Sequence, residues 1–464
     1  MRASVDLRHS PEVVYSNRAE LGCLLPALAN GAQVGMFGTP AIAPIQMTRV
    51  NRIRVMASIS LDYGTTSCWH GEIDDAHLLW QFNGPPALLD VVGTITEGLQ
   101  NPLDFPALRQ ALVPGDKVVI VLDRHVPSAA EVIAGVWQQL LMAAIGPEDV
   151  QILQPIALTG VRPNDPRRLL PENVRDAVLW KVHDPTDDQG IGYLASSADG
   201  ERIYLAREVL NADFVLPISR LGFDPVQGRR SVMSSFYPGL SNTAAFAKSR
   251  GQGHSELGPD EERPLSQRIQ EIAWLLGIQF ALQIMPASSH GGAAGILAGN
   301  PEAVAQRGRS LLDSSWRIRF DQRGETAIVS IPSSPDDATD WDQLGAALEA
   351  ASRLVVREGR IIVLSDLAAE PGPGIQLLKA SRSAKAALQP LRRESPPDLV
   401  AASQIAAASD WASIYLLSKV PSQVIEDAFM TPLESEAEVS RLVQTCDGCM
   451  VLAGAQHVYT EAPA

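Results

Sequence analysis

The clearest pattern in the chain is a pair of short apolar runs separated by a segment of helical character. The run GDKVVIVLD (115–123) starts with turn residues and continues with β-branched apolar residues, which is typical of a buried strand. A helical pattern follows from Ser128 to Ile145, and DVQILQPIAL (149–158) is the second apolar run. A strand, a helix and a strand of these lengths predict a βαβ unit, and hence a parallel sheet with a right-handed crossover.

The second half of the chain repeats this alternation. Strand patterns at 325–337 and 359–367 flank an alanine-rich helical pattern at 341–356, and the runs WASIYLLSKV and GCMVLAGA extend the same predicted sheet. Between the halves, the polar and glycine-rich stretch 248–264 is typical of a hinge. We therefore predict an α/β protein of two domains, each with a mostly parallel sheet flanked by helices, and a ligand cleft between them.

The first 55 residues lack this alternation. The segment from Leu21 to Thr48 carries no charge, but prolines and glycines interrupt it and no signal-peptide pattern is present. We predict that residues 1–55 form a poorly ordered extension, with Met56 as an alternative start. The predicted domains are then 56–260, an N-terminal α/β domain, and 261–464, a C-terminal one.

Composition narrows the classes of partner. The formal net charge is −15, which opposes binding to nucleic-acid phosphates but not to a small anion in a locally basic pocket. Four cysteines in 464 residues form no disulfide framework, so we expect a reducing, cytoplasmic environment. Cys446 and Cys449 form an isolated C-x-x-C, interpreted as a turn before a strand. No membrane partner is expected, and the sequence is compatible with an oligomer.

Candidate chemistry gathers after the two predicted strands of the first half, where α/β proteins bind ligands. Asp123 and His125 follow the first strand, and Thr159, Gly160 and Arg162 follow the second. Histidine suits acid–base work near neutral pH, and arginine suits bidentate binding of a carboxylate. The alternatives, a solvated loop histidine and a surface arginine, stay open.

Two further arginines and a lack of metal motifs complete the pattern. Arg229 and Arg230 follow a glycine in VQGRRS and could bind an anion as a pair, although paired arginines commonly just face water. The chain has no H-E-x-x-H or comparable ligand spacing. We therefore predict no metal-binding residues from the sequence itself.

The order of these motifs resembles the nickel-dependent lactate racemase family. PGDKVVIVLDRHVP is similar to the family's strand and Asp-x-Thr-Arg-Pro-x-Pro loop, ALTGVRP to its Thr-Gly loop, and FYPGLSNTAAF to its Pro-Gly loop. The resemblance extends from about residue 60 to 460. It implies a racemase or epimerase in which a nickel-pincer nucleotide, joined covalently to a lysine, accepts hydride from a 2-hydroxy acid while a histidine removes the hydroxyl proton.

The resemblance fails at the positions that this chemistry needs. The family's histidine in the Thr-Gly loop falls on Val161, and its substrate-binding arginine falls on Val126. The anchoring lysine falls near Ser234, and no lysine occurs between Lys181 and Lys248. Valine cannot move a proton, and the lack of a lysine argues against covalent attachment of the cofactor.

Other positions of the family pattern are retained. By resemblance, Asp123, Arg162 and Gln343 would contact the substrate, and Thr159 and Gly160 would contact the cofactor. The cofactor is thus implied by resemblance alone.

Two functions follow from the sequence, and it leaves open whether the protein is an enzyme. The first is a divergent racemase-like isomerase acting on a 2-hydroxy acid or similar small carboxylate, with His125 as acid or base and Arg229 or Arg230 assisting Arg162. The alternative is a non-catalytic homologue that binds or senses such a metabolite, because sites on a shared scaffold diverge readily. A purely structural role is a third alternative.

Overall fold

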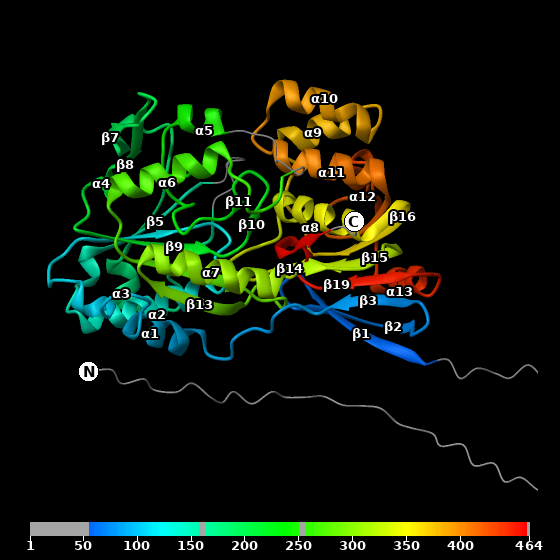
Figure 1. The fold of residues 1–464 in the computed structure, drawn as a ribbon, viewed down its shortest axis with the longest axis horizontal. Helices are drawn as coiled ribbons and strands as arrows, with labels where there is room; N and C mark the ends of the chain where they lie inside the picture. Colours follow the sequence, from blue (N-terminus) through cyan, green and yellow to red (C-terminus); the bar gives the residue numbers. More distant parts are fainter. Residues whose placement is uncertain (1–54, 157–162, 250–256, 462–464) are drawn as a thin grey trace, which may run out of the picture. The chain divides into compact units, whose positions relative to one another are not determined.

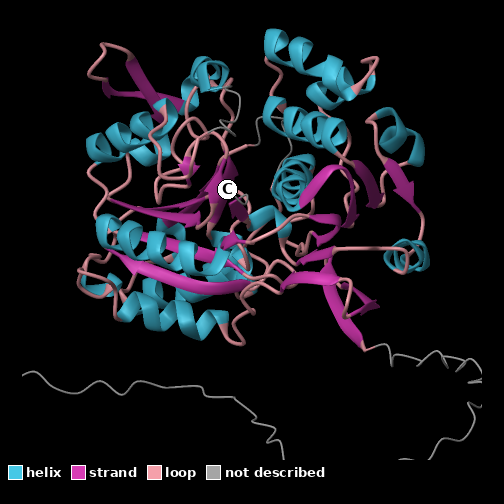
Figure 2. Ribbon diagram, turned by 45° about the vertical axis from the view of Figure 1, so that its right-hand side comes forward, coloured by secondary structure: helices cyan, strands magenta, loops and turns pink. Residues whose placement is uncertain are grey.

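The computed structural model describes residues 55–156, 163–249 and 257–461, and the chain from Arg54 onward forms one compact unit. Apart from Val55, the predicted N-terminal extension lies outside the described residues, as does part of the predicted hinge at 248–264. The unit contains two six-stranded sheets flanked by helices (Figures 1 and 2), which confirms the predicted α/β class.

The first sheet is mixed and has a buried centre. Its spatial order is β13 (Ala293–Gly299), β12 (Ala281–Pro286), β9 (Phe214–Arg220), β4 (Val118–Leu122), β5 (Val150–Gln154) and β6 (Leu179–Val182). Neighbouring strands are parallel except β12 and β13, which are antiparallel. Every residue of β4 is buried, as a strand covered on both faces requires.

The strand order of this sheet contains a reversal. From β4 the chain moves outward to β5 and β6, and then returns to the opposite side of β4 to form β9 and β12. The loops that leave β4 and β9 therefore run away from each other at the carboxyl edge of the sheet. Open α/β sheets bind ligands at such switch points.

The second sheet is wholly parallel and contains the same kind of reversal. Its spatial order is β18 (Thr431–Leu433), β17 (Ser413–Leu417), β16 (Val355–Leu364), β15 (Gly324–Ser330), β19 (Cys449–Leu452) and β3 (Leu78–Phe82). From β15 the chain moves outward through β16 and β17 to β18, and then returns to the opposite side of β15 as β19. The second switch point thus lies between β15 and β19.

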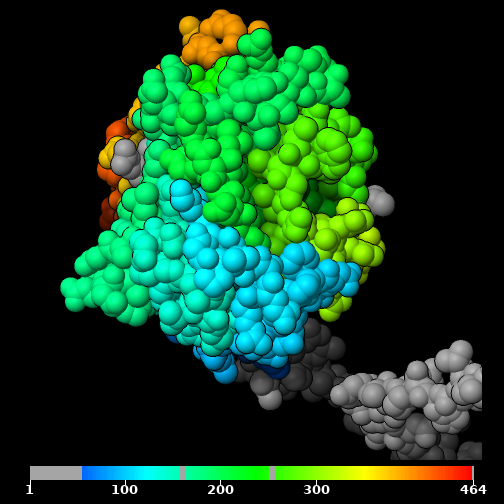
Figure 3. Space-filling view, turned by 90° about the vertical axis from the view of Figure 1, so that its left-hand side faces the viewer, coloured from blue at the N-terminus to red at the C-terminus, as the bar shows by residue number. Residues whose placement is uncertain are grey.

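Side chains alternate between the two faces of each sheet, so each sheet packs against an apolar layer on both faces. Val118, Ile120 and Leu122 of β4 pack with α1 (Val91–Gln100) and α2 (Ala129–Met142). Val119 and Val121 face the opposite layer, which includes α6 (Pro264–Leu276). In Figure 1, α1 and α2 accordingly lie on one side of the first sheet and α6 on the other. The side view of Figure 3 shows this end of the unit, coloured mainly cyan and green.

The second sheet is covered by a helical layer on one face and by a hairpin on the other. The helical layer comprises α8 (Trp341–Leu354), α9 (Pro373–Lys379), α10 (Ala384–Glu394) and α11 (Leu399–Trp411). The opposite face packs against α13 (Glu436–Val443) and the hairpin of β1 (Met56–Tyr63) and β2 (Ser67–Asp74). α7 (Pro301–Trp316) connects the sheets, because its Trp316 is fully buried in the core of the second.

Shorter elements surround these layers. The remaining helices are α3 (Glu172–Ala177), α4 (Arg207–Leu210), α5 (Thr243–Ser249) and α12 (Ser422–Asp427), with 3₁₀ turns η1 (Leu108–Gln110), η2 (Pro147–Asp149), η3 (Asp188–Gly190) and η4 (Ala455–His457). Three further strand pairs are β7 (Ile191–Ser196) with β8 (Arg202–Ala206), β10 (Phe223–Asp224) with β11 (Gly228–Arg229), and β14 (Arg317–Arg319) with β20 (Tyr459–Glu461).

The division into domains at residue 260 stays a prediction. Each sheet contains strands from both sides of residue 260. β3 precedes residue 260 and belongs to the second sheet, whereas β12 and β13 follow it and complete the first.

Two segments have structures that local sequence does not favour. The glycine-rich segment 288–301 contains β13, whose backbone pairs with β12. After α1, the chain as far as β4 forms only the turn η1. Prolines at 102, 106 and 114 flank that turn, and proline does not continue a helix.

Candidate functional site

The two switch points face the same cavity. Asp123 and His125 follow β4, and Arg220 ends β9, so all three lie at the switch point of the first sheet. Gln456, from η4 after β19, supplies the second sheet's side of the cavity. The cavity has a volume of about 280 Å³ and lies between the two sheets.

A buried ion-pair network forms one wall. Asp123 is 5% exposed; one of its oxygens accepts the Arg124 backbone N–H at 2.8 Å and the other pairs with the Arg230 guanidinium. Arg230 also pairs with Asp224 at 3.1 Å. Burial alone would lower the pKa of Arg230, but the two carboxylates outweigh burial and raise it. One cation is therefore shared by two carboxylates.

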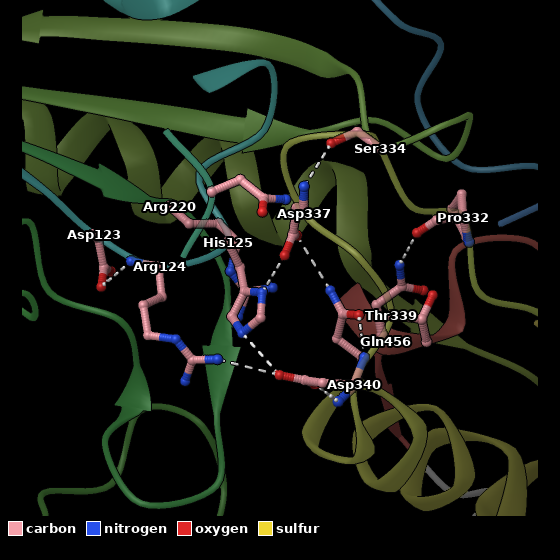
Figure 4. Close-up of polar contacts among 12 residues, drawn as sticks. Asp123, Arg124, His125, Arg220, Pro332, Ser334, Asp337, Thr339, Asp340 and Gln456 are labelled. Carbon is pink, nitrogen blue, oxygen red and sulfur yellow. Dashed lines mark hydrogen bonds and ion pairs between the residues drawn. The ribbon is translucent and has the colours of Figure 1, made fainter. Parts of the chain in front are cut away.

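His125 connects the loop after β4 to the loop after β15. Its Nδ1 contacts the Asp337 carboxylate and its Nε2 lies 3.4 Å from Asp340 Oδ2, as Figure 4 shows. Burial alone would lower the pKa of His125, but the two carboxylates outweigh burial and raise it to about 9. At neutral pH the ring is therefore an imidazolium, which can donate a proton but cannot accept one.

Asp340 is fixed by the helix that it starts. It is the N-cap of α8: one oxygen accepts the Gln343 backbone N–H at 2.9 Å, and the Gln343 side chain accepts the Asp340 N–H at 3.2 Å. Its other oxygen lies 3.2 Å from Arg124 Nη2. Burial alone would raise the pKa of Asp340, but His125 and Arg124 hold it well below its ordinary value. The capping box thus positions a carboxylate for His125.

Arg220 and His457 form a second polar pair in the cleft. Arg220 Nη1 lies 3.2 Å from His457 Nδ1 and donates a hydrogen bond to it. Burial, Arg220 and His125 hold the pKa of His457 well below its ordinary value, so this imidazole is neutral. Burial and the neighbouring Arg230 lower the pKa of Arg220 to about 10, which still leaves it cationic at neutral pH.

Several buried polar atoms at the cavity have no hydrogen-bond partner among the described residues. They are Nε of Arg220, Nε of Arg230, Oγ of Ser235 and Oε1 of Gln456. Buried polar groups are normally hydrogen-bonded, and an unmade bond costs about 1–3 kcal/mol. Donors and acceptors are therefore available to a polar ligand. Apolar side chains, including Ile156, Val226, Phe246 and Leu265, form much of the remaining wall.

Asp342 is the one titratable group lining this cavity, among the described residues, with a pKa shifted to near neutrality. Desolvation and the Asp340 carboxylate raise the pKa of Asp342 to about 6. Asp342 is nevertheless an exposed residue, so solvent screens its interactions in part.

The predicted site residues fall into three groups. Asp123, His125, Arg230 and Gln343 line the cavity, and Gln343 also donates to Asp337 at 3.2 Å. Arg229 points elsewhere: its guanidinium pairs with Asp260 at 2.9 Å and Asp313 at 2.8 Å. Thr159, Gly160 and Arg162 lie outside the described residues. Pro155 and Ile156, just before that loop, line the cavity.

Sequence reasoning missed Arg220, Asp337, Asp340 and His457. Arg220 could have been found, because it ends a strand pattern at the carboxyl edge where ligands bind. The others follow from the packing of the second sheet against the first. Asp340 and Gln343 have the spacing of a capping box, but that spacing indicates a helix start rather than a contact with His125.

No metal site is built from the described side chains, since no group of three or more His, Cys, Asp or Glu there could hold an ion. None of the helices in these ranges is long and apolar enough to span a bilayer.

Residues 70–250 match the lactate racemase N-terminal domain family. Among solved structures, the lactate racemase apoprotein of Thermoanaerobacterium thermosaccharolyticum is 17% identical, with 87% of this chain and 100% of that chain covered and a TM-score of 0.69. A protein from Thermotoga maritima is 12% identical, with 82% and 100% covered and a TM-score of 0.60. None of the curated proteins matches the chain.

Residues 70–250 are therefore similar to the lactate racemase N-terminal domain, and the fold of the chain resembles that of the lactate racemase apoprotein. The matched segment includes β4, β5 and β9 with the loops that follow them. At 12–17% identity the solved structures show the fold alone. The roles of individual residues stay predictions.

Proposed function

We propose that the cleft binds a small organic carboxylate of the 2-hydroxy acid class, with the carboxylate against Arg220. The observation that carries this proposal is the charge of Arg220. Among the described residues it forms no ion pair at hydrogen-bonding distance, and its guanidinium donates to the neutral His457. Arg230 beside it is already shared by two carboxylates. The carboxylates of Asp337, Asp123 and Asp224 attract Arg220 only from beyond salt-bridge distance. A bound anion in direct contact would therefore offset more of the cost of burying this cation.

The rest of the ligand would meet polar groups near Arg220 and apolar groups beyond. The unpartnered Ser235 hydroxyl can donate and the Gln456 carbonyl can accept, which suits a hydroxyl next to a carboxylate. Ile156 and Phe246 would contact the substituent at C2. Arg162 stays a candidate second cation from the loop outside the described residues. Arg229 is left out because Asp260 and Asp313 already neutralise it.

The lysine-tethered nickel-pincer group implied by the resemblance does not fit this cavity. None of the described residues that line it is a lysine. Lys181 pairs with Glu208 and Lys248 with Glu201. Ser234, near the predicted anchoring position, donates its hydroxyl to Gln227 at 2.7 Å. A hydroxyl cannot form the amine-derived linkage, so the proposed function uses no step through that group.

A second candidate function, racemisation of the bound acid, is favoured by one observation. The cavity contains a protonated imidazole, His125, and a carboxyl of near-neutral pKa, Asp342. Together they offer an acid and a base. Racemisation by this pair predicts exchange of the C2 proton of lactate with deuterated solvent, lost in Asp342→Asn. If the wild type shows no exchange, racemisation is refuted and only the binding function is left.

The binding proposal is tested by titrating the full chain with D-lactate, L-lactate and the neutral analogue lactamide in a calorimeter. We expect lactate to bind and lactamide to bind at least tenfold more weakly, because the ion pair with Arg220 is lost. Arg220→Gln should weaken lactate binding by a similar factor. Arg202→Gln, an exposed arginine on β8, is the control. Equal affinity for lactate and lactamide would refute the proposal.

A further inference from the structure

A second groove adjoins the cleft on the side of the helical layer. It has a volume of about 430 Å³ and lies between α8, α10 and α11, which Figure 1 shows stacked over the second sheet. Pro225, Val400 and Gln404 line both the cleft and this groove. A smaller cavity also joins them, since Gln404 and Arg353 border it on one side and Asp224 and Gln456 on the other. The cleft and the groove are therefore continuous.

The groove carries an excess of positive charge. Arg323, Arg353 and Arg392 line it, with Glu349 as the one acidic residue among the described lining residues. Glu349 pairs with Arg353 at 2.9 Å and accepts from Gln404 Nε2 at 2.5 Å. Arg323 and Arg392 have no ion pair with any described residue. The chain has a net charge of −15, so a groove with two unpaired arginines is locally positive in a protein that is negative overall.

Both arginines have ordinary structural contacts, but neither contact neutralises them. Arg323 lies over the Trp411 ring, with its Cζ 5.4 Å from the ring centroid. Arg392 is in the last turn of α10, where a cation interacts favourably with the helix dipole. Their guanidinium N–H groups stay available to an anion.

An unpartnered hydroxyl supports the same conclusion. Ser403, on α11, lines the groove, and its Oγ is buried with no hydrogen-bond partner among the described residues. A hydroxyl and two unpaired arginines that line one groove suit an oxyanion with several acceptor oxygens, because each oxygen can accept a different donor. A phosphate group has that form and carries up to two negative charges.

We infer that the ligand of the cleft carries a second anionic group of the phosphate type, held in this groove by Arg323 and Arg392. The inference rests on the proposed function for its carboxylate end alone. The ligand class is then a phosphorylated 2-hydroxy acid rather than a simple one such as lactate.

The test compares glycerate with 3-phosphoglycerate, which differ only in the phosphate group, by calorimetric titration of the full chain in a phosphate-free buffer. We expect 3-phosphoglycerate to bind at least tenfold more tightly than glycerate. Arg323→Gln and Arg392→Gln should each remove most of that difference and leave glycerate binding unchanged. The control is Arg393→Gln, on the same helix, which pairs with Glu394 and does not line the groove.

The outcomes separate the two proposals. Equal affinity for the two acids, with both weakened by Arg220→Gln, would overturn the groove and keep the proposed function. Binding of 3-phosphoglycerate that depends on Arg392 but not on Arg220, with no binding of glycerate, would support the groove and refute the carboxylate site. No binding of 3-phosphoglycerate would overturn the inference. Loss of binding in Arg393→Gln equal to that in Arg392→Gln would also overturn it.

Discussion

The ion pairs of His125 give the most direct test of the site's electrostatics. The free imidazole has a pKa of 6.5, and in the folded protein the carboxylates of Asp337 and Asp340 raise it to about 9. His125→Gln removes the charge and keeps a polar side chain of similar size. A shift of this size corresponds to about 3 kcal/mol of folding free energy. The side chain is only 18% exposed, so solvent screens the interaction only in part.

The sign of the pH dependence follows from the raised pKa. The imidazolium stabilises the folded state fully below pH 6.5, and this stabilisation is lost as the pH rises through about 9. The other charged groups facing the ring are Asp337, Asp340 and Arg124, and Asp340 stays ionised over this range because its own pKa is lowered. The wild type should therefore exceed His125→Gln in stability by about 3 kcal/mol at pH 6, and the difference should shrink towards pH 10.

Urea unfolding of both proteins at pH 6, 7.5, 9 and 10 measures this difference. The histidine ring signals in NMR spectra, with the His125 signal assigned by its absence in the variant, give the pKa directly. Asp340→Asn is the matched variant, because asparagine also caps helices well but supplies no charge. It should lower the pKa of His125 while α8 stays folded. A stability difference independent of pH, or a His125 pKa at or below 6.5, would refute this account.

Three further predictions concern other parts of the unit. Because the pKa of His457 is depressed, its neutral form stabilises the fold above pH 6.5, and that stabilisation is lost as the pH falls below 6.5. In urea unfolding, His457→Gln should therefore lose less stability than the wild type between pH 6.5 and 5. An equal loss of stability in the two proteins would contradict a buried neutral ring. Gly299→Ala should lower the free energy of unfolding by about 2 kcal/mol or more, since φ is +139° and a Cβ would lie 2.2 Å from the Leu103 carbonyl oxygen. An unchanged melting temperature would show that the backbone at Leu103 moves to make room for the Cβ. Arg220→Gln should stabilise the ligand-free protein in thermal unfolding while it weakens lactate binding, because it removes a buried cation that lies beside Arg230 and has no carboxylate in direct contact. The opposite change in stability would count against an anion site there.

Local sequence patterns were enough to predict the main strands and helices of both sheets. The buried run of β4, the helix α2 and the run of β5 were predicted because short β-branched apolar segments between turn residues have few other stable arrangements. Prediction was weaker where glycine content dominated, as in β13. That strand gains its hydrogen bonds from β12 rather than from its own preference.

The sequence by itself determined the α/β class, the strand–helix–strand order of the βαβ unit, and the placement of Asp123 and His125 at the carboxyl end of a strand. Only the tertiary structure decided that β9 returns beside β4 and β19 beside β15, which brings Arg220 and Gln456 to one cavity. It also decided that Arg230 faces the cleft while Arg229 pairs with Asp260. The physical reason is that strand periodicity is a local property, whereas strand order and side-chain partners depend on contacts between residues far apart in the chain, such as Tyr63 and Glu436, 373 positions apart.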